Sequence, residues 1–294
     1  MDPKTPNIPQ QPQAAKVQPQ PAKVQPKKAD NKPVTSKVKG WNALAVIAVC
    51  AIVAVVLYIF VLGAPGNFKE VGDGKTAPIN LMGTVYKGGF VVPILLTCLF
   101  TVIMLTIERF FALSKAKGKG SITKFVANVK DALRNKDIAK AEDLCKKQKG
   151  TVGAIVYATL QKYKEMDKDT MLEKEQKLTS IQQTLEEATA LEMPSLQQNL
   201  PIIATLTTLG TLLGLFGTVL GMIKSFQALS QSGAPDSTEL STGISEALVN
   251  TATGIATAAL ALISYNYFTG RIDNMTYAID ELGFSIVSTF AATH

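Results

Sequence analysis

The sequence has almost none of the residues that build enzymatic or metal-binding sites. It contains one histidine, His294 at its end, and three cysteines. A lone terminal histidine excludes histidine-based triads and histidine-rich metal sites, and no cluster of carboxylates and cysteines replaces them. Cys50 and Cys98 fall in apolar stretches, and Cys145 falls in a segment expected to face the reducing cytoplasm, so no disulfide is expected. We therefore expect no enzymatic activity, no metal and no cofactor.

Long stretches of the chain also lack charge. Residues 41–63, 88–107, 202–223 and 247–270 contain no Asp, Glu, Lys or Arg. Each stretch has about 20 residues or more, the length at which a helix crosses a bilayer core of about 30 Å. A buried helix of a soluble protein normally interrupts its apolar face with charge every turn or two. The sequence therefore predicts an all-α integral membrane protein with four transmembrane helices.

The formal charge of +7 is distributed unevenly between the predicted spans. Eight lysines lie in residues 1–40, three in residues 64–87, and neither Lys nor Arg in residues 227–246, whereas the segment after the second span opens with five basic residues. Because Lys and Arg concentrate on the cytoplasmic side, both termini and residues 108–201 are predicted to lie on the cytoplasmic side of a bacterial inner membrane. The predicted organisation is a cytoplasmic tail (1–40), spans 41–63, 88–112, 202–226 and 247–270, periplasmic loops 64–87 and 227–246, a helical cytoplasmic domain (113–201) and a cytoplasmic C-terminal helix (271–294).

The tail, residues 1–40, is rich in Pro, Gln and Lys and has few large apolar residues. Such a segment cannot bury enough surface to offset the ordering of its backbone, so we predict disorder. Two roles remain open, a solvated tether and a set of lysines that touch anionic lipid headgroups. The first span follows this long polar tail and is therefore interpreted as an uncleaved anchor.

The cytoplasmic segment has the apolar periodicity of helices. The spacing predicts two short helices up to Gly150 and a third over residues 152–164. A fourth is expected to begin at Thr170, where Thr170 and Glu173 have the spacing of a capping box. Its seam positions, Leu178, Ile181, Leu185 and Ala188, alternate in steps of three and four. We expect this helix to continue into the third span as one rod, the alternative being two helices broken at Pro201.

Small and polar residues dominate the last two spans. The third span carries Gly210, Gly214, Gly217 and Gly221, which form Gly-xxx-Gly pairs that permit close helix packing, and the fourth carries Gly254. We expect the glycine-rich third span to hold a homo-oligomer together. The two spans also contain nine polar side chains, more than tight packing requires, which suggests a hydrated or inter-helix polar face: Thr205, Thr207, Thr208, Thr211, Thr218, Asn250, Thr251, Thr253 and Thr257.

Glu246 stands where the fourth span enters the membrane. Asn250, Thr253, Gly254 and Thr257 follow at +4, +7, +8 and +11, which places all five on one helical stripe. Ionisable groups at such depth usually face a water path or a partner. An ordinary glutamate at the membrane surface is the alternative. Lys224 is expected to extend from the outer end of the third span toward water.

Three passages resemble the ExbB/TolQ/MotA family of ion-channel subunits, most closely its ExbB branch. They are Ile-Glu-Arg-Phe at 107–110, GLFGTVLGMI at 214–223, and ISEALVNTATG at 244–254 with Tyr265-Asn266 after it. The resemblance covers roughly residues 85–275. It implies a pentamer-like ring of helical subunits around an ExbD- or TolR-like single-span partner that brings a membrane aspartate, and coupling of ion flow to a TonB-like protein that energises outer-membrane uptake in a Gram-negative cell.

The resemblance also implies roles for particular residues. Thr218 and Thr251 match the family's pore-facing threonines, and Glu246 matches its acidic residue. Asn250 and Thr211 are expected to face the same ion pathway. The chain departs from the family pattern at Thr211 and Leu260, where proline is common. The extra hydroxyl at Thr211 leaves open whether the carried ion is a proton or sodium. The first span is additional to the three-span ExbB core. A TolQ-like or MotA-like stator subunit and a non-conducting membrane scaffold are the competing hypotheses.

Overall fold

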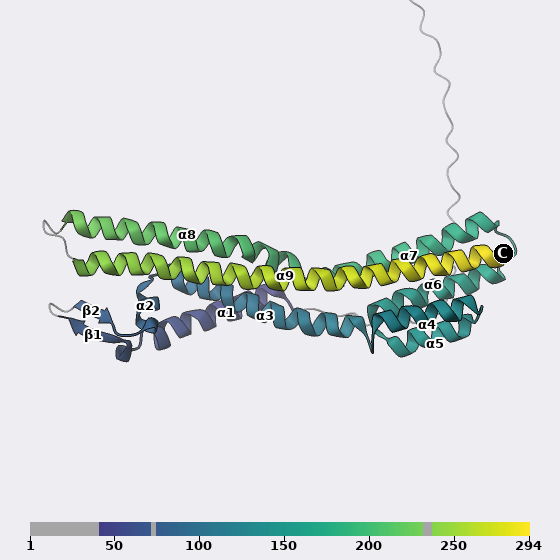
Figure 1. Cartoon of the computed structure of the whole chain (residues 1–294), viewed down its shortest axis with the longest axis horizontal. Helices are drawn as coiled ribbons and strands as arrows, with labels where there is room; N and C mark the ends of the chain where they lie inside the picture. Colours follow the sequence, from purple (N-terminus) through teal and green to yellow (C-terminus); the bar gives the residue numbers. More distant parts are fainter. Residues whose placement is uncertain (1–40, 72–74, 232–236) are drawn as a thin grey trace, which may run out of the picture. The chain divides into compact units, whose positions relative to one another are not determined.

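The computed structural model describes residues 41–71, 75–231 and 237–294, and these are almost wholly α-helical (Figure 1). The predicted disordered tail, residues 1–40, lies outside the described residues, as does part of the predicted loop 227–246. The described residues pair two strands in addition to the helices, so the all-α expectation holds apart from one short hairpin.

Four helical stretches are long and apolar enough to cross a membrane: 43–62, 91–134, 200–227 and 240–293. The first is α1 (Ala43–Val56), capped by Asn42 and extended by a π-helical turn, η1 (Leu57–Leu62). The second contains α3 (Val91–Lys117), and the others lie in α8 (Leu200–Gln231) and α9 (Ser237–Thr293). The sequence prediction of four spans is thereby confirmed.

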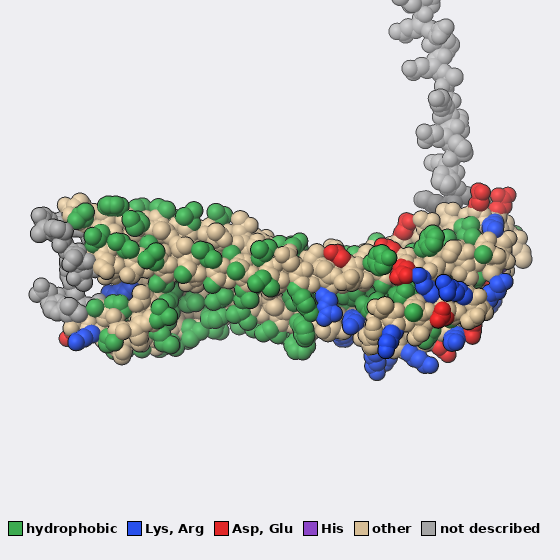
Figure 2. Space-filling view, viewed as in Figure 1, with side chains coloured by type: hydrophobic (Ala, Val, Ile, Leu, Met, Phe, Trp, Pro, Cys, Tyr) green, Lys and Arg blue, Asp and Glu red, His purple; other side chains and the backbone are tan. Residues whose placement is uncertain are grey.

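These helices leave large apolar side chains uncovered. Leu44, Ile52 and Phe60 of the first stretch and Leu212 and Leu215 of α8 are all more than half exposed. Figure 2 shows hydrophobic side chains spread over the part formed by α1, α3, α8 and the first half of α9, and charged side chains gathered over α4 to α7. Since water would penalise so much uncovered apolar surface, lipid or further protein surrounds this part.

The remaining helices form a bundle with the second half of α9. They are α4 (Ile122–Arg134), α5 (Ile138–Gln148), α6 (Gly150–Lys168) and α7 (Lys174–Gln197). The face of α9 that packs into this bundle repeats in steps of three and four: Ile272, Met275, Ile279, Leu282, Ile286 and Phe290. At 57 residues α9 is about 85 Å long, so one helix serves both the span and the bundle.

The turns between these helices differ from two of the expectations. Helix α7 begins at Lys174, with Glu173 as its N-cap and Gln176 closing the capping box, so the expected start at Thr170 is wrong. The oxygen of Asp169 instead accepts hydrogen bonds from the Met171 and Leu172 amides in the turn before it. Of the expected seam, Ile181 is fully buried and Leu178, Leu185 and Ala188 pack against the same core.

The expected continuous rod from α7 into α8 is also wrong. The helix tolerates Pro194 but ends at Gln197, and α8 begins at Leu200. Between them Asn199 has a φ of 64°, a left-handed conformation that asparagine adopts more readily than most residues. The helices therefore break just before Pro201, close to the alternative considered from the sequence.

The segment after α1 is folded. Strands β1 (Phe68–Val71) and β2 (Lys75–Pro78) pair antiparallel, with Phe68 opposite Pro78, and helices η2 (Pro65–Asn67) and α2 (Leu81–Lys87) flank them. Asn80 caps α2 and donates a hydrogen bond to Asn67 Oδ1 at 2.9 Å. The Tyr58 ring stacks on Tyr86 with centroids 4.7 Å apart, which ties α2 to η1.

Candidate polar seam between α8 and α9

Helices α8 and α9 make the most extensive contact between elements in the described chain, and glycines make it possible. A Cβ at Gly254 of α9 would lie 2.5 Å from the Gly210 carbonyl oxygen and 2.7 Å from Gly214 Cα, both backbone atoms of α8. A Cβ at Gly221 would lie 2.8 Å from the Gly243 carbonyl oxygen. No other residue fits at these positions without moving a helix, because two backbones approach there.

The glycine face of α8 is therefore filled by α9 of the same chain. Gly217 completes it, since a Cβ there would lie 2.5 Å from the Asn250 Cβ. The expectation that this face holds neighbouring copies together is thus wrong. A homo-oligomer would have to use other faces of α8 and α9, where large apolar side chains are exposed.

Thr218 of α8 and Thr251 of α9 face each other across this seam. Their hydroxyls are in hydrogen-bond contact, and the Thr218 hydroxyl also lies 3.1 Å from the Gly214 carbonyl oxygen and 3.3 Å from that of Ala247. Thr251 Oγ1 donates to the Gly214 carbonyl at 3.4 Å as an alternative. Both side chains are half-buried, so the pair combines polar atoms from two helices at the rim of the seam.

Asn250 occupies the position beside Thr251 but points into the chain. It is buried between Gly217 and the loop before α3, and its Nδ2 donates to the Gly88 carbonyl at 3.1 Å. Its Oδ1 is buried and has no hydrogen-bond partner among the described residues. An unsatisfied buried amide oxygen costs roughly 1–3 kcal/mol, so this position is either strained or completed by a molecule outside the chain.

Glu246 lies one turn before Asn250 and has a partner that the sequence did not identify. Lys224 Nζ of α8 lies 3.0 Å from Glu246 Oε2, and the Glu246 side chain is only 12% exposed while that of Lys224 is 53% exposed. Lys224 therefore bends back across the seam in place of extending freely toward water. The spacing of 22 residues hides this pair from any single-helix pattern.

The rest of the expected stripe on α9 does not form a polar path. Thr257 is fully buried, and the hydroxyls of Thr253 and Thr257 donate to carbonyls of their own helix, those of Val249 and Thr253. Thr211 of α8 is exposed and bonds the Thr207 carbonyl one turn back. The structure thus brings Thr218 and Thr251 together, pairs Glu246 with Lys224, and leaves Thr211 apart from them.

A second polar cluster lies where the spans meet the bundle. Glu108 and Arg109 of α3 are both buried and form an ion pair at 2.5 Å. Arg109 Nη1 also donates to the Ser195 carbonyl, and the Asn199 side chain donates to Glu108 Oε2 at 3.3 Å. Asn199 further donates to the Trp41 carbonyl at 3.2 Å. This cluster connects the start of α1, the end of α3 and the α7–α8 break.

The chemistry that the seam offers is that of a polar wall. Threonine hydroxyls both donate and accept hydrogen bonds and carry no charge. Glu246 and Lys224 carry opposite charges and pair with each other at the end of the seam away from the α4–α7 bundle. Among the described residues no group of three or more His, Cys, Asp or Glu side chains could hold a metal ion.

Comparison with known proteins finds one family whose sequence profile includes this seam. Residues 147–281 match the profile described as the MotA/TolQ/ExbB proton channel family. The match begins at the α5–α6 turn and includes α6, α7, α8 and most of α9, and so contains Thr218, Glu246 and Thr251.

Curated relatives share part of this region. The chain is 38% identical over 92 residues to biopolymer transport protein ExbB-like 3 of Synechocystis, covering 31% of this chain and 44% of that protein. It is 37% identical over 82 residues to the Tol-Pal system protein TolQ of Haemophilus influenzae, covering 28% and 36%. It is 31% identical over 85 residues to the biopolymer transport protein ExbB of Salmonella typhimurium, covering 29% and 35%. In each case the match spans less than half the length of the relative.

Proposed function

We propose that this chain, whose residues 147–281 match the MotA/TolQ/ExbB proton channel family, is an ExbB-like subunit of an inner-membrane ion-driven motor. In this role it works with an ExbD- or TolR-like single-span partner and couples the proton motive force to a TonB-like protein that energises outer-membrane transport. The observation that carries the proposal is the contact between the Thr218 and Thr251 hydroxyls at the half-buried rim of the α8–α9 seam.

The energetics of conduction favour such a wall. One elementary charge that crosses the membrane gains about 2.3 kcal/mol per 100 mV, so a site much deeper than a few kcal/mol would trap the ion. Neutral hydroxyls can accept and donate to a moving carboxylic acid or ion without binding it strongly. The titrating carboxylate then belongs to the partner helix, which would lie against the rim formed by Thr218 and Thr251.

Glu246 has a steering role in this proposal. Its pairing with Lys224 reduces the net negative charge at the outer end of the seam, so attraction of cations there depends on the pair opening. Glu246→Gln should therefore lower the rate of ion entry and should leave the subunit's fold intact. Thr211 and Asn250 would act indirectly. Thr211 lies on an exposed face of α8, and Asn250 positions the α9 backbone against Gly217.

Assembly into a ring would use the exposed apolar faces. Leu212, Leu215 and Val219 of α8 are each at least half exposed and lie on the side away from the glycines. Because the glycine face is already packed against α9, these side chains are the surface that a second copy can cover. A pentamer-like homo-oligomer around the partner span is the arrangement we propose.

The test uses variants that keep side-chain shape and remove the hydroxyl. Thr218→Val and Thr251→Val should leave the complex assembled and should lower transport driven by the membrane potential by about five- to tenfold, the cost of one lost hydrogen bond of roughly 1–1.5 kcal/mol to the moving group. The measurement is energy-dependent uptake in cells that express the chain with its candidate partner, beside the mass of the intact purified complex.

Thr205→Val is the matched control. Thr205 lies on the same helix and is exposed, and its hydroxyl donates to the Pro201 carbonyl of its own helix at 2.8 Å. This variant should transport at the wild-type rate. If Thr218→Val, Thr251→Val and Glu246→Gln all assemble and transport normally, the polar-wall role is wrong and the non-conducting scaffold becomes the better interpretation.

A TolQ-like role is a second candidate, because the relatives include TolQ proteins of Haemophilus influenzae and Pseudomonas aeruginosa. The two roles differ in the protein that receives the work. Deletion of the gene should abolish TonB-dependent uptake under the ExbB-like proposal, whereas a defect confined to outer-membrane integrity would indicate the TolQ-like role. A neighbouring gene for a short protein with one span and a membrane aspartate would support either over the scaffold.

We also propose that both termini and the α4–α7 bundle face the cytoplasm, as the lysine asymmetry predicts. Gly66 and Lys119 are exposed on opposite sides of the proposed membrane and suit single-cysteine labelling. Gly66→Cys should react with an impermeant maleimide once only the outer membrane is opened, and Lys119→Cys only after the inner membrane is opened. The reverse pattern would show that the orientation is inverted.

A further inference from the structure

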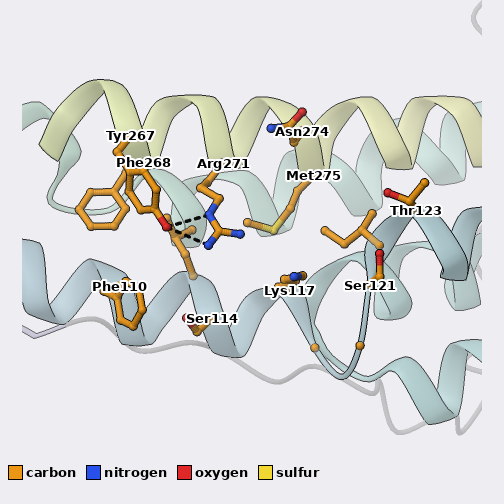
Figure 3. Close-up of a pocket in the computed structure, with 14 residues that line it drawn as sticks. Phe110, Ser114, Lys117, Ser121, Thr123, Tyr267, Phe268, Arg271, Asn274 and Met275 are labelled. Atoms are coloured by element: carbon orange, nitrogen blue, oxygen red, sulfur yellow. Dashed lines mark hydrogen bonds between the residues drawn. The ribbon is translucent and has the colours of Figure 1, made fainter. Parts of the chain in front are cut away.

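A cavity of about 390 Å³ lies where α3 and α9 leave the apolar part of the protein and meet the start of α4. Its lining changes character along its length. Phe110 of α3 and Tyr267 of α9 lie at the end nearest the spans, Lys117 and Ser121 lie nearer the bundle, and Arg271 lies between them (Figure 3). The cavity is therefore amphipathic along the direction in which a bilayer changes from acyl chains to headgroups.

The basic side chains that line this cavity form no ion pair with a carboxylate of the described chain. Arg271 extends from α9 toward α3, where its Nε and Nη2 donate to the Tyr267 hydroxyl at 3.1 and 2.8 Å (Figure 3). These bonds occupy two of the five N–H donors of the guanidinium, which leaves three that bond to no described residue. Lys117 is half-buried, and its ammonium makes no ion pair with a described carboxylate.

The surface around the cavity marks the depth of the membrane boundary. Phe110, Phe111 and Ile263 are all about half exposed or more on the side of the spans. Figure 2 shows the apolar surface giving way to Lys and Arg side chains at this level. An occupant must therefore present a negative group toward Lys117 and Arg271 and an apolar group toward Phe110 and Tyr267.

We propose that this cavity binds the headgroup of an anionic phospholipid from the leaflet on the side of the bundle. Basic pockets between membrane helices on the cytoplasmic side commonly bind such headgroups. Arg271 and Lys117 hold the phosphate, the hydroxyls of Ser114 and Ser121 complete its hydrogen bonds, and the first acyl carbons lie along Phe110 and Tyr267. Tyr267 acts as a positioning residue, because its hydroxyl holds the guanidinium in the cavity.

The experiment measures lipid binding to the full-length chain in detergent by native mass spectrometry. Dioleoyl phosphatidylglycerol and dioleoyl phosphatidylcholine are titrated separately, since they share acyl chains and differ in net charge. We expect phosphatidylglycerol to bind at least about tenfold more tightly. Lys117→Gln with Arg271→Gln should remove about tenfold or more of that affinity, at about 1.4 kcal/mol per tenfold, and should lower phosphatidylcholine binding less, because the choline cation offsets the charge of its phosphate.

Lys115→Gln with Lys119→Gln is the matched control. Both lysines are exposed in the same stretch and neither lines the cavity, so the control removes the same charge and should bind phosphatidylglycerol as the wild type does. Ser114→Phe fills the cavity without changing charge and should also lower phosphatidylglycerol binding. Arg271→Lys keeps the charge and should retain most of the preference. If the double glutamine variant does not fold, these two single variants decide the proposal.

Three results would overturn the proposal. Equal losses in the control and in the cavity variant would show that diffuse surface charge attracts the lipid. Equal binding of the two lipids to the wild type would show that no headgroup is selected. Displacement of phosphatidylglycerol by an excess of inorganic phosphate, with equal protection by phosphate alone, would show that the cavity is a free-anion site and that the acyl contacts contribute nothing.

Discussion

Replacing Gly254 by alanine tests the packing on which the polar seam depends. The new Cβ would meet the Gly210 carbonyl oxygen at 2.5 Å and Gly214 Cα at 2.7 Å, about 0.7–0.9 Å inside ordinary van der Waals contact. Both atoms belong to the backbone of α8 and cannot rotate away. The two helices must therefore separate locally, and Thr251, three residues before Gly254, must move away from Thr218.

The size of the effect follows from two opposing terms. Overpacking of this kind costs roughly 1–3 kcal/mol, while replacing glycine by alanine inside a helix gains up to about 1 kcal/mol. Gly270→Ala isolates the second term, because a Cβ at Gly270 of the same helix would meet nothing within 4 Å. The free energy of unfolding of the two variants should therefore differ by about 1–3 kcal/mol, with Gly254→Ala the less stable.

The assay is thermal unfolding of the purified chain in nanodiscs, since chain size and lipid are then the same for both variants. At roughly 2–4 °C per kcal/mol, the apparent Tm of Gly254→Ala should fall below that of Gly270→Ala by a few to about ten degrees. Membrane-potential-driven transport should fall with it. Equal apparent Tm values would refute the close α8–α9 contact, and a lower Tm with normal transport would separate the seam from conduction.

Two further predictions concern buried groups outside the seam. Arg109→Met should destabilise the protein by about 3–5 kcal/mol, because it leaves the buried Glu108 without its counter-charge. Glu108→Gln with Arg109→Met should recover much of this loss. The measurement is the apparent Tm, and a double variant as unstable as the single one would contradict the pairing. Cys145 should resist maleimide at pH 8 until the protein is denatured, because burial raises the pKa of its thiol to about 12, and rapid labelling of the folded chain would show that α5 is not packed as described.

The spans could be predicted from the sequence because uncharged length alone identifies them. The core positions Leu178 and Ile181 of α7 could also be predicted, because their spacing is a local property of one helix. Thr218 and Thr251 were singled out only through resemblance to a family, and their contact was not predicted. No spacing within either helix says that two residues 33 positions apart share a seam.

The errors arise where tertiary contacts decide the local structure. The break before Pro201 depends on Asn199, whose side chain bonds Glu108 and Trp41, 91 and 158 residues away. Two overlapping capping boxes compete at the start of α7, and the one with Glu173 as its cap forms. The glycines of α8 pack as Gly-xxx-Gly faces do, but composition cannot tell whether the second helix comes from the same chain or from a neighbour.

Of the two seam helices, α9 runs unbroken into the bundle, whereas α8 is separated from the bundle helix α7 by a break. Helix α9 carries Thr251, Arg271 and the buried Phe290 without a break, so we expect a displacement at the seam to reach the bundle core. Helix α8 is instead separated from α7 at Asn199, where the Glu108–Arg109 pair and the Trp41 carbonyl hold the joint. If the proposed partner helix pushes on Thr218 and Thr251, we expect α9 to move as one rigid helix and the chain to bend at the α7–α8 joint. The first span contributes to this arrangement, because the carbonyl of Trp41 at its start accepts a hydrogen bond from the Asn199 side chain.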